Sequence, residues 1–448
     1  MKLDDFQADT SDEILKLDDY QADTSEEIPK LMIPKLIQVF SLQRDVIYGI
    51  SRFLWENPES SFHEVKAHEY LTNLLEGEGF DVERRFVADT GFRAVFTYDG
   101  PISSNGESSG DSRLPHVCFL CEYDSTEQVG HAAGHNLKCA ASIAAALSIK
   151  ECLRKKKLRG KVSLLGTPGE DCGGGTKINM VSQGTFCCID CCLMLAPLNM
   201  NLLYPKFYTL LVVKVSYKGK AAHASAFPWE GRNALDAAVA CYNNIGLLRQ
   251  QLKPTWSING IIRHGGIQPN VIPEYTELMF WLRAPNHADL VLIQQKCTAC
   301  FVAAAKATGC EADFHFEETP YYPMEHNQKL GEIYKEQALS VGMQFNESHI
   351  AQTMHIGSTD FGNVSQVVSC IMPAFDIGKK VHIHSIDFHT FCGTEEATDN
   401  MLIAAKALAL TAAEVMSSKS VLEAVRVEYD EQHGRRTSAV LQRIMSHD

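Results

Sequence analysis

Residues 121–136 read Cys-Glu-Tyr-Asp-Ser-Thr-Glu-Gln-Val-Gly-His-Ala-Ala-Gly-His-Asn, a turn in which a glycine precedes each of two histidines. The apolar run 115–121 leads into this turn and is typical of a buried strand, and the small-residue segment 137–150 that follows is typical of a helix. Open α/β sheets place their ligands beyond the carboxyl ends of strands. We therefore expect His131 and His135 to lie at a functional site.

The composition limits the kinds of protein that this chain can be. A length of 448 residues exceeds one ordinary core and predicts two domains. No apolar run approaches the roughly 20 residues of a membrane span, and the acidic N-terminus lacks the pattern of a secretory signal. Fifteen cysteines without such a signal predict free thiols in a reducing compartment, the cytoplasm. A net charge of −14 argues against nucleic acid as a partner.

The N-terminal segment contains a tandem repeat, because residues 2–14 recur almost unchanged as residues 16–28. The two copies together hold ten acidic residues and two lysines. Two copies are too few for a stacked repeat architecture. The composition favours a disordered acidic tail over residues 1–33, and a segment that docks on a partner is the alternative.

A second buried strand, predicted over residues 160–168, ends in two adjacent carboxylates, Glu170 and Asp171, followed by three glycines. Carboxylates at the end of a strand suit metal binding or proton transfer. From the residues alone, a capped turn into a helix over 176–183 explains them equally well.

The middle of the chain reads as a separate unit with the order strand, helix, strand, strand, helix, strand, which is the ferredoxin-like split motif. Its predicted strands are 208–217, 256–263, 275–283 and 311–316, and its predicted helices are 233–252 and 288–308. Such a unit, inserted between two halves of an α/β domain, suggests a lid or a dimerisation module. We therefore expect a tail over 1–33, a catalytic domain over 34–205 and 318–430, the inserted unit over 206–317, and a C-terminal tail over 431–448.

Six short motifs resemble those of the M20 peptidase family, in its amidohydrolase branch. They are Gly130–Leu137, Gly166–Asp171, Gly219–Ser225, Pro228–Asp236, Gly265–Asn270 and Gly357–Asp360. The resemblance implies an α/β fold, with a mixed-sheet, zinc-peptidase-like catalytic domain and an inserted ferredoxin-like lid and dimerisation domain. It also implies that two metal ions, zinc or manganese, promote hydrolysis of the amide bond of small dipeptides of the β-alanyl-lysine type or of N-acyl amino acids.

The resemblance assigns metal-site roles position by position. Glu170 matches the general base, His135 and His384 match histidine ligands, and Asp171 stands where the family has a glutamate ligand. The other two ligand positions hold Ala133 and Ala196, which offer no electron pair to a metal. Two cations about 3.5–4 Å apart need a bridging anion between them, and one of the two lost ligands is the bridge. We therefore expect at most one metal per chain, or none, and impaired hydrolysis.

Three other residues are possible substitutes for the lost ligands. His131, Cys139 and Cys172 lie near the lost positions in sequence, although none stands at a family ligand position. The cysteine-rich run 187–192 and the pair Cys297 and Cys300 superficially suggest zinc. Structural zinc needs four ligands converging from turns, so we interpret these cysteines as small buried apolar residues.

On the substrate side, the resemblance implies that His223 reaches the site of a partner subunit in a homodimer and stabilises the carbonyl oxyanion. It implies that Asn270 and Arg283 hold a substrate carboxylate, and that Gly357, Ser358 and Thr359 line the pocket. Two hypotheses follow. One is an active dipeptidase or amidohydrolase with one metal on His135, Asp171 and His384. The other is a catalytically impaired homologue that binds small peptides or pairs with an active relative.

Overall fold

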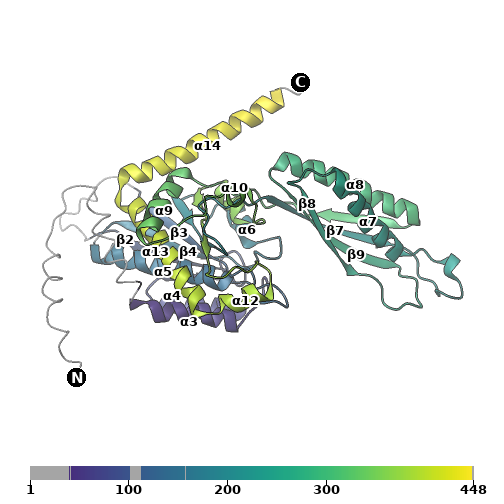
Figure 1. Cartoon of the computed structure of the whole chain (residues 1–448), viewed down its shortest axis with the longest axis horizontal. Coiled ribbons are helices and arrows are strands. Elements are labelled where there is room, and N and C mark those ends of the chain that lie inside the picture. The colour runs from purple at the N-terminus through teal and green to yellow at the C-terminus, as the bar shows by residue number, and fades with distance from the viewer. Residues whose placement is uncertain (1–39, 41, 101–112, 157, 446–448) are drawn as a thin grey trace.

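The computed structural model describes residues 40, 42–100, 113–156 and 158–445. The acidic repeat over 2–28 lies outside these residues. The expected fold class is confirmed, because the chain forms an α/β domain and a second domain with the ferredoxin-like order of strands and helices (Figure 1). The positions at which we divided the chain into domains stay a prediction.

The larger domain is built on a mixed sheet whose order, within the described residues, is β1-β2-β4-β3-β5-β11. Strands β4, β3, β5 and β11 run parallel to one another, whereas β1 and β2 are antiparallel to their neighbours. The strands are β1 (Asp81–Arg84), β2 (Phe92–Tyr98), β3 (His116–Cys121), β4 (Gly160–Gly166), β5 (Cys191–Leu193) and β11 (Ser369–Ile371). Strand β3 is buried along its whole length because it lies inside the parallel part of the sheet.

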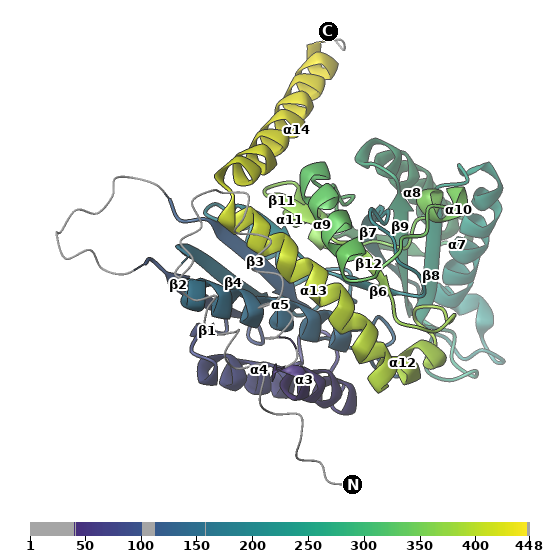
Figure 2. The same cartoon turned by 60° about the vertical axis from the view of Figure 1, so that its left-hand side comes forward.

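Helices cover both faces of this sheet, as Figure 2 shows for the face that carries α5 and α13. On that face, side chains such as Phe119 pack with the helices, and on the opposite face Leu120 packs with α6 and α11. The first face carries α3 (Arg44–Glu56), α4 (Val65–Gly77), α5 (His135–Lys156), α9 (Gln328–Ser340) and α13 (Glu395–Ser417). The second carries α6 (Thr176–Ser182) and α11 (Phe361–Ser365). Alanines line the contact of α5 with α13, so the two helices pack closely.

The smaller domain is an antiparallel sheet of order β10-β7-β9-β8 with its own hydrophobic core. Its strands are β7 (Thr209–Lys218), β8 (Ser257–His264), β9 (Tyr275–Ala284) and β10 (Glu311–Phe316), and its helices are α7 (Ala234–Leu248) and α8 (His287–Thr308). Strand β9 alternates buried and partly exposed side chains because one sheet face packs on the helices and the other is open.

The two chain segments that enter and leave this domain are hydrogen bonded to each other. Leu210 donates its backbone N–H to the carbonyl of Tyr321 at 3.1 Å, and Tyr321 donates to the carbonyl of Leu210 at 2.9 Å. The hydroxyl of Thr209 also donates to the carbonyl of Tyr321 at 2.6 Å. The crossing between the domains is therefore a paired ribbon.

The sequence also predicts one strand over 188–195 and one over 367–375, and this prediction was wrong. Each of the two segments contributes only a short strand to the main sheet. Each segment then continues into a second short strand, and these two, β6 (Ala196–Leu198) and β12 (Ala374–Asp376), pair with each other. Pro373, which has no N–H to donate, stands at the break in the second segment.

The C-terminal tail predicted over 431–448 is helical up to Met445, as the end of α14 (Lys419–Met445), which extends from the larger domain (Figure 1). Its first turns pack Leu422 and Val425 into the core, and no proline interrupts the helix-forming residues that follow. Short helices α10 (His349–Thr353) and α12 (Ile386–Cys392) complete the elements near the site.

Two helices in the described residues, α8 and α13, are long and apolar enough to cross a membrane, but each packs in the core of its own domain.

We predict that His116 makes the fold sensitive to acid. Its Nδ1 donates to the carbonyl of Cys188 and its Nε2 accepts from the hydroxyl of Ser163, both at 2.9 Å, which suits a neutral ring. Burial lowers the pKa of His116 to about 4. Because the folded pKa lies below the unfolded value, stability should fall as pH drops from about 6.5 toward 4, by about 2 kcal/mol between pH 7 and pH 5.

Urea unfolding of the unaltered protein and of His116→Gln at both pH values measures this contribution. The stability difference between the two proteins should shrink by about 2 kcal/mol on going to pH 5. A His315→Gln variant, altered at an exposed position, is the control and should follow the unaltered protein. A constant difference between the unaltered protein and His116→Gln would contradict the assignment.

Candidate functional site

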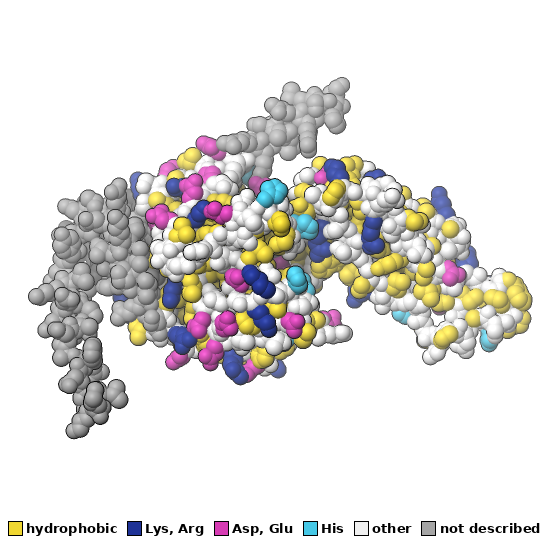
Figure 3. All heavy atoms as spheres, in the orientation of Figure 1, with side chains coloured by type: hydrophobic (Ala, Val, Ile, Leu, Met, Phe, Trp, Pro, Cys, Tyr) yellow, Lys and Arg dark blue, Asp and Glu magenta, His cyan; other side chains and the backbone are white. Residues whose placement is uncertain are grey.

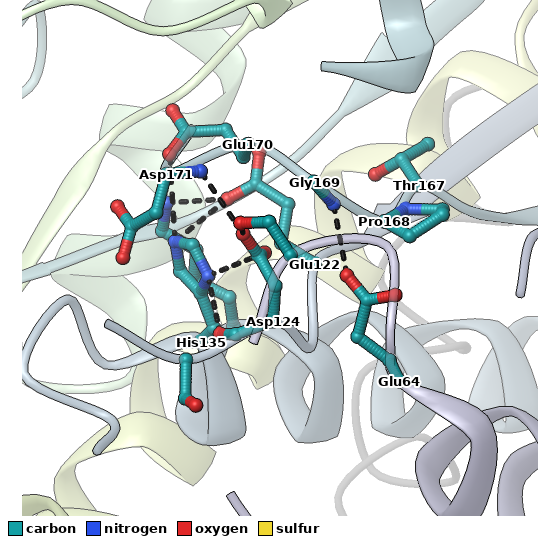
Figure 4. Close-up of polar contacts among 12 residues, drawn as sticks. Glu64, Glu122, Asp124, His135, Thr167, Pro168, Gly169, Glu170 and Asp171 are labelled. Carbon is teal, nitrogen blue, oxygen red and sulfur yellow. Dashed lines mark hydrogen bonds and ion pairs between the residues drawn. The ribbon is translucent and has the colours of Figure 1, made fainter. Parts of the chain in front are cut away.

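The candidate site lies where the parallel strands end. Glu122 and Asp124 follow β3, Glu170 and Asp171 follow β4, and His135 is the first residue of α5 (Figure 4). The carboxyl ends of parallel strands meet at one edge of the sheet, which is the edge where open α/β folds bind ligands.

The glycine before His135 holds the turn against the neighbouring strand β6. Gly134 has a φ of 71°, and a Cβ atom on it would lie 2.5 Å from Cγ of Pro197. Only glycine allows this approach. His384 enters from the other half of the chain with a φ of 63°, and its N–H donates to the carbonyl of Ala132 at 2.9 Å. A histidine in the left-handed region is uncommon and is held there by its surroundings.

His135 is oriented by Asp124. Its Nδ1 lies 2.9 Å from Oδ1 of Asp124 and 2.9 Å from the backbone carbonyl of the same residue. Its Nε2 is buried and has no hydrogen-bond partner among the described residues; it lies 3.4 Å from Oε2 of Glu122 and 3.7 Å from Oε2 of Glu170. Burial and Lys138 oppose protonation, but Asp124 outweighs them and raises the pKa of His135 to about 10.

Two lysines reach the same cluster of carboxylates. Nζ of Lys138 lies 2.5 Å from Oε2 of Glu122, and Nζ of Lys177 lies 2.7 Å from Oε1 of the same side chain. Lys177 also pairs with Oδ1 of Asp360 at 2.6 Å. All four side chains are buried, and the exposed fraction is 6% for Lys138 and 0% for the other three. Burial opposes ionisation of Glu122, but the two ammonium groups hold its pKa well below the usual range.

Glu170 is positioned through its backbone and its loop. Its carbonyl accepts a hydrogen bond from the hydroxyl of Tyr321 at 2.8 Å. The preceding residue, Gly169, donates its N–H to Oε1 of Glu64 at 3.0 Å, a contact drawn in Figure 4. Asp171 is fixed on the other side, because its Oδ2 accepts from Thr126 at 2.7 Å. Burial and the charge of Glu122 raise the pKa of Glu170 to about 8.

A cavity of about 350 Å³ brings most of the predicted site residues together. Its lining includes the predicted ligands and general base, the vacated ligand position, and the predicted substrate contacts: His135, Asp171, His384, Glu170, Ala133, Arg283, Gly357, Ser358 and Thr359. A neighbouring cavity of about 500 Å³ shares Arg283 and Gly357 with it. The remaining predicted residues, Ala196, His223 and Asn270, do not line either cavity.

Arg283 reaches the cavity from β9 of the inserted domain. It donates to Oδ1 of Asn259 at 3.2 Å and lies over the ring of Trp281. Its Nε is buried without a hydrogen-bond partner in the described part of the chain. A buried donor without a partner costs free energy, so this guanidinium is suited to a carboxylate of a bound ligand.

The side chains that could hold a metal ion also pair with one another. In the described residues, two groups could supply metal ligands: Glu122, His135 and Glu170, and Asp124, His135 and Asp171. In the first group, both oxygens of Glu122 already face ammonium groups. In the second, Asp124 is already bonded to Nδ1 of His135. Ala133 and Ala196 supply no donor atom. His135, Asp171 and His384 line the same cavity, but His384 belongs to neither group, so a single-cation site on these three residues stays a prediction.

The proposed substitute ligands lie outside both groups. Nε2 of His131 is bonded to the carbonyl of Leu54, and the thiol of Cys172 points at the carbonyl of Gly169. Cys139 is buried inside α5. Neither group of potential ligands in the described ranges contains a cysteine.

Sequence reasoning missed five residues of the cluster: Glu122, Asp124, Lys138, Lys177 and Asp360. Signals for all of them except Lys177 were present in the sequence. Glu122 and Asp124 stand in the turn that follows β3, and Asp360 ends a motif that we had quoted. Lys138 is a charged residue in a segment of small apolar residues, which is a place where a lysine needs a partner.

We predict that Lys177 is required for the fold of this site. Replacing Lys177 with methionine leaves Asp360 as a buried charge without its partner, which should cost about 3–5 kcal/mol of stability. Lys335→Met removes an exposed lysine whose pair with Glu347 is open to solvent, and this control should cost less than about 1 kcal/mol. Urea unfolding followed by circular dichroism measures both. Equal losses in the two variants would show that the buried ion pair does not matter for folding.

The sequence and the fold of this chain are similar to those of known proteins. Residues 209–308 match a family model described as the peptidase dimerisation domain. The chain is 41% identical to the Xaa-Arg dipeptidase of Mus musculus over 387 residues, covering 85% of this chain and 88% of that protein, and 39% identical to the Homo sapiens Xaa-Arg dipeptidase with the same coverages. A solved structure of a dinuclear metal-binding M20 peptidase from Bacillus subtilis superposes with a TM-score of 0.57 at 17% identity, over 84% of this chain and 99% of that one, which speaks for the fold alone. From its curated relatives, the chain belongs to the M20 peptidase family.

Proposed function

We propose that this chain binds small peptides that carry a free carboxylate, and that it hydrolyses them weakly or not at all. The observation that carries the proposal is the contrast within one cavity. Arg283, Ser358 and Thr359 line this cavity and can contact a ligand. Ala133 also lines it and offers no metal ligand, and so does Lys138, which pairs with Glu122.

The ligand class follows from the charges and from the relatives. Arg283 supplies a buried guanidinium donor, and an arginine binds a carboxylate through two parallel hydrogen bonds. The relatives are named for dipeptides ending in arginine, and a further one, 27% identical, is named for p-aminobenzoyl-glutamate. These compounds share an amide bond next to an amino acid with a free carboxylate. Xaa-Arg and β-alanyl-lysine dipeptides are therefore the first ligands to test.

A one-metal dipeptidase is the second candidate, and the free Nε2 of His135 favours it. His135, Asp171 and His384 would hold one zinc or manganese ion, which supplies Lewis-acid chemistry when bound. Glu170 is then the group that holds or moves a proton at its Oε2, and Arg283 orients the ligand carboxylate.

The cellular setting is also part of the proposal. All fifteen cysteines lie in the described residues, and none of them forms a disulfide there. Free thiols are typical of a reducing compartment, so we place the protein in the cytoplasm. A catalytically impaired member of the family could also act as the dimer partner of an active homologue, and this is the alternative to pairing with a second copy of this chain.

The first test combines metal content, hydrolysis and binding. Elemental analysis of the purified protein should find at most one divalent metal per chain. Turnover of an Xaa-Arg dipeptide should fall below the ordinary enzymatic range of about 1–1000 per second. Calorimetry should nevertheless detect binding of the intact dipeptide. Two metals per chain together with ordinary turnover would sink the proposal.

Arg283→Met tests how the ligand is held. Loss of a charge-assisted hydrogen bond, about 1.5–3 kcal/mol, should weaken dipeptide binding roughly 10- to 100-fold. The control is Arg263→Met, which alters an arginine of the same sheet that pairs with Glu277 at the surface, and it should leave the affinity unchanged. If both variants bind the dipeptide like the unaltered protein, Arg283 does not hold the carboxylate.

We further propose that two copies pair through the inserted domain. Strand β8 lies at an edge of its sheet, and its Ile261 is 60% exposed beside the partly exposed Ile262. Figure 3 shows hydrophobic side chains spread over the visible face of this domain. An open edge with apolar side chains is a ready surface for strand pairing. Such a pair would also give His223 and Asn270, which lie away from the cavity of their own chain, access to the partner's site.

Light scattering at micromolar concentration should report a dimer, and Ile261→Lys should shift it to a monomer because a charge would be buried at the edge. Leu292→Lys alters an exposed position on α8 instead and should leave the dimer intact. A monomer in the unaltered protein would refute the pairing.

A further inference from the structure

The two buried lysines are the feature of the site that peptide binding does not explain. Lys138 comes from α5 and Lys177 from α6, and their ammonium groups converge on the two oxygens of one carboxylate, Glu122. Burying an ammonium group is costly unless it is paired. Here the charges alternate along a chain of four side chains from Lys138 to Glu122, Lys177 and Asp360, so each buried charge has an opposite neighbour.

The backbone is shaped to allow this arrangement. A Cβ atom on Gly175 would lie 2.0 Å from Oδ2 of Asp360, so a glycine is needed for Asp360 to reach Lys177. The N–H of Gly175 is bonded to the hydroxyl of Tyr321 at 3.0 Å, which fixes the start of α6. The ion chain is therefore built into the ends of β3, α5, α6 and α11.

We propose that Lys138 and Lys177 act as built-in cations: they neutralise the acidic cluster in place of bound metal ions, and Lys138 keeps a divalent cation away from Glu122, His135 and Glu170. This inference rests on the proposed function, in which the cavity binds peptides without a pair of metal ions.

The geometry supports exclusion as well as charge balance. A cation bound by Nε2 of His135 and Oε2 of Glu170 would have Oε2 of Glu122 as its third ligand. That oxygen is already 2.5 Å from Nζ of Lys138. The cation would thus face an ammonium group across one shared oxygen, in a buried site where like charges repel strongly. Restoring lost ligands is therefore not sufficient to restore a metal pair.

The test restores the ligands with and without the lysine. One variant carries Ala133→Cys, Ala196→His and Asp171→Glu, and a second adds Lys138→Met. After equilibration with Zn²⁺ and removal of free metal, elemental analysis should find at most one zinc per chain in the first and close to two in the second. Lys335→Met in place of Lys138→Met is the matched control and should leave the count at the first value. Two zinc ions in the first variant, or no gain in the second, would overturn the inference.

If the combined variants do not fold, the Tm of the single variant Lys138→Met tests the same inference. Zn²⁺ added beyond any metal that the purified protein already holds should leave the Tm of the unaltered protein unchanged. Lys138→Met should have a lower Tm, and Zn²⁺ should raise it by at least about 3 °C, because the ion stabilises the state that binds it. A Lys138→Met protein that Zn²⁺ does not stabilise contradicts the inference. If the unaltered protein holds at most one metal but hydrolyses dipeptides at an ordinary rate, the proposed function is wrong and the inference about the lysines still stands.

Discussion

Charge neutralisation at the strand ends is the constraint on which the catalytic domain depends. Glu122, Asp124, Glu170, Asp171 and Asp360 gather where the parallel strands stop, and an uncompensated group of buried carboxylates would separate these ends. The lysines from α5 and α6 supply the opposite charge, and the ring of His135 contacts Asp124. Because each pair joins two elements, the same contacts that neutralise the cluster also fix how the helices stand on the sheet.

The fold could be predicted because its signals are local. Continuous apolar runs indicated the buried parallel strands, alternating residues indicated the strands of the inserted domain, and the motif order matched one family. Where the prediction failed, tertiary context decided. The segments 188–195 and 367–375 each form a short strand and then continue into a second one, where the chain leaves the main sheet.

The site could be predicted in part. His135, Glu170, Asp171 and His384 stand in recognisable motifs, and the cavity brings them together with Arg283. Lys138 stands out as a lysine among small apolar residues, but the partner of neither lysine could be assigned, because Glu122 comes from another element. Glu122 was within the first turn considered, yet its role depends on both lysines. Pattern reasoning names the residues that a chemistry requires, but it does not show which opposite charges surround them.

The paired ribbon between the domains has a mechanical consequence. Since Leu210 and Tyr321 are hydrogen bonded in both directions, the two crossings cannot swivel independently and behave as one hinge. The hydroxyl of Tyr321 sits beyond that hinge, between the carbonyl of Glu170 and the N–H of Gly175. The ribbon that joins the two domains is thus tied, through one phenol, to the backbone of the loop that carries Glu170.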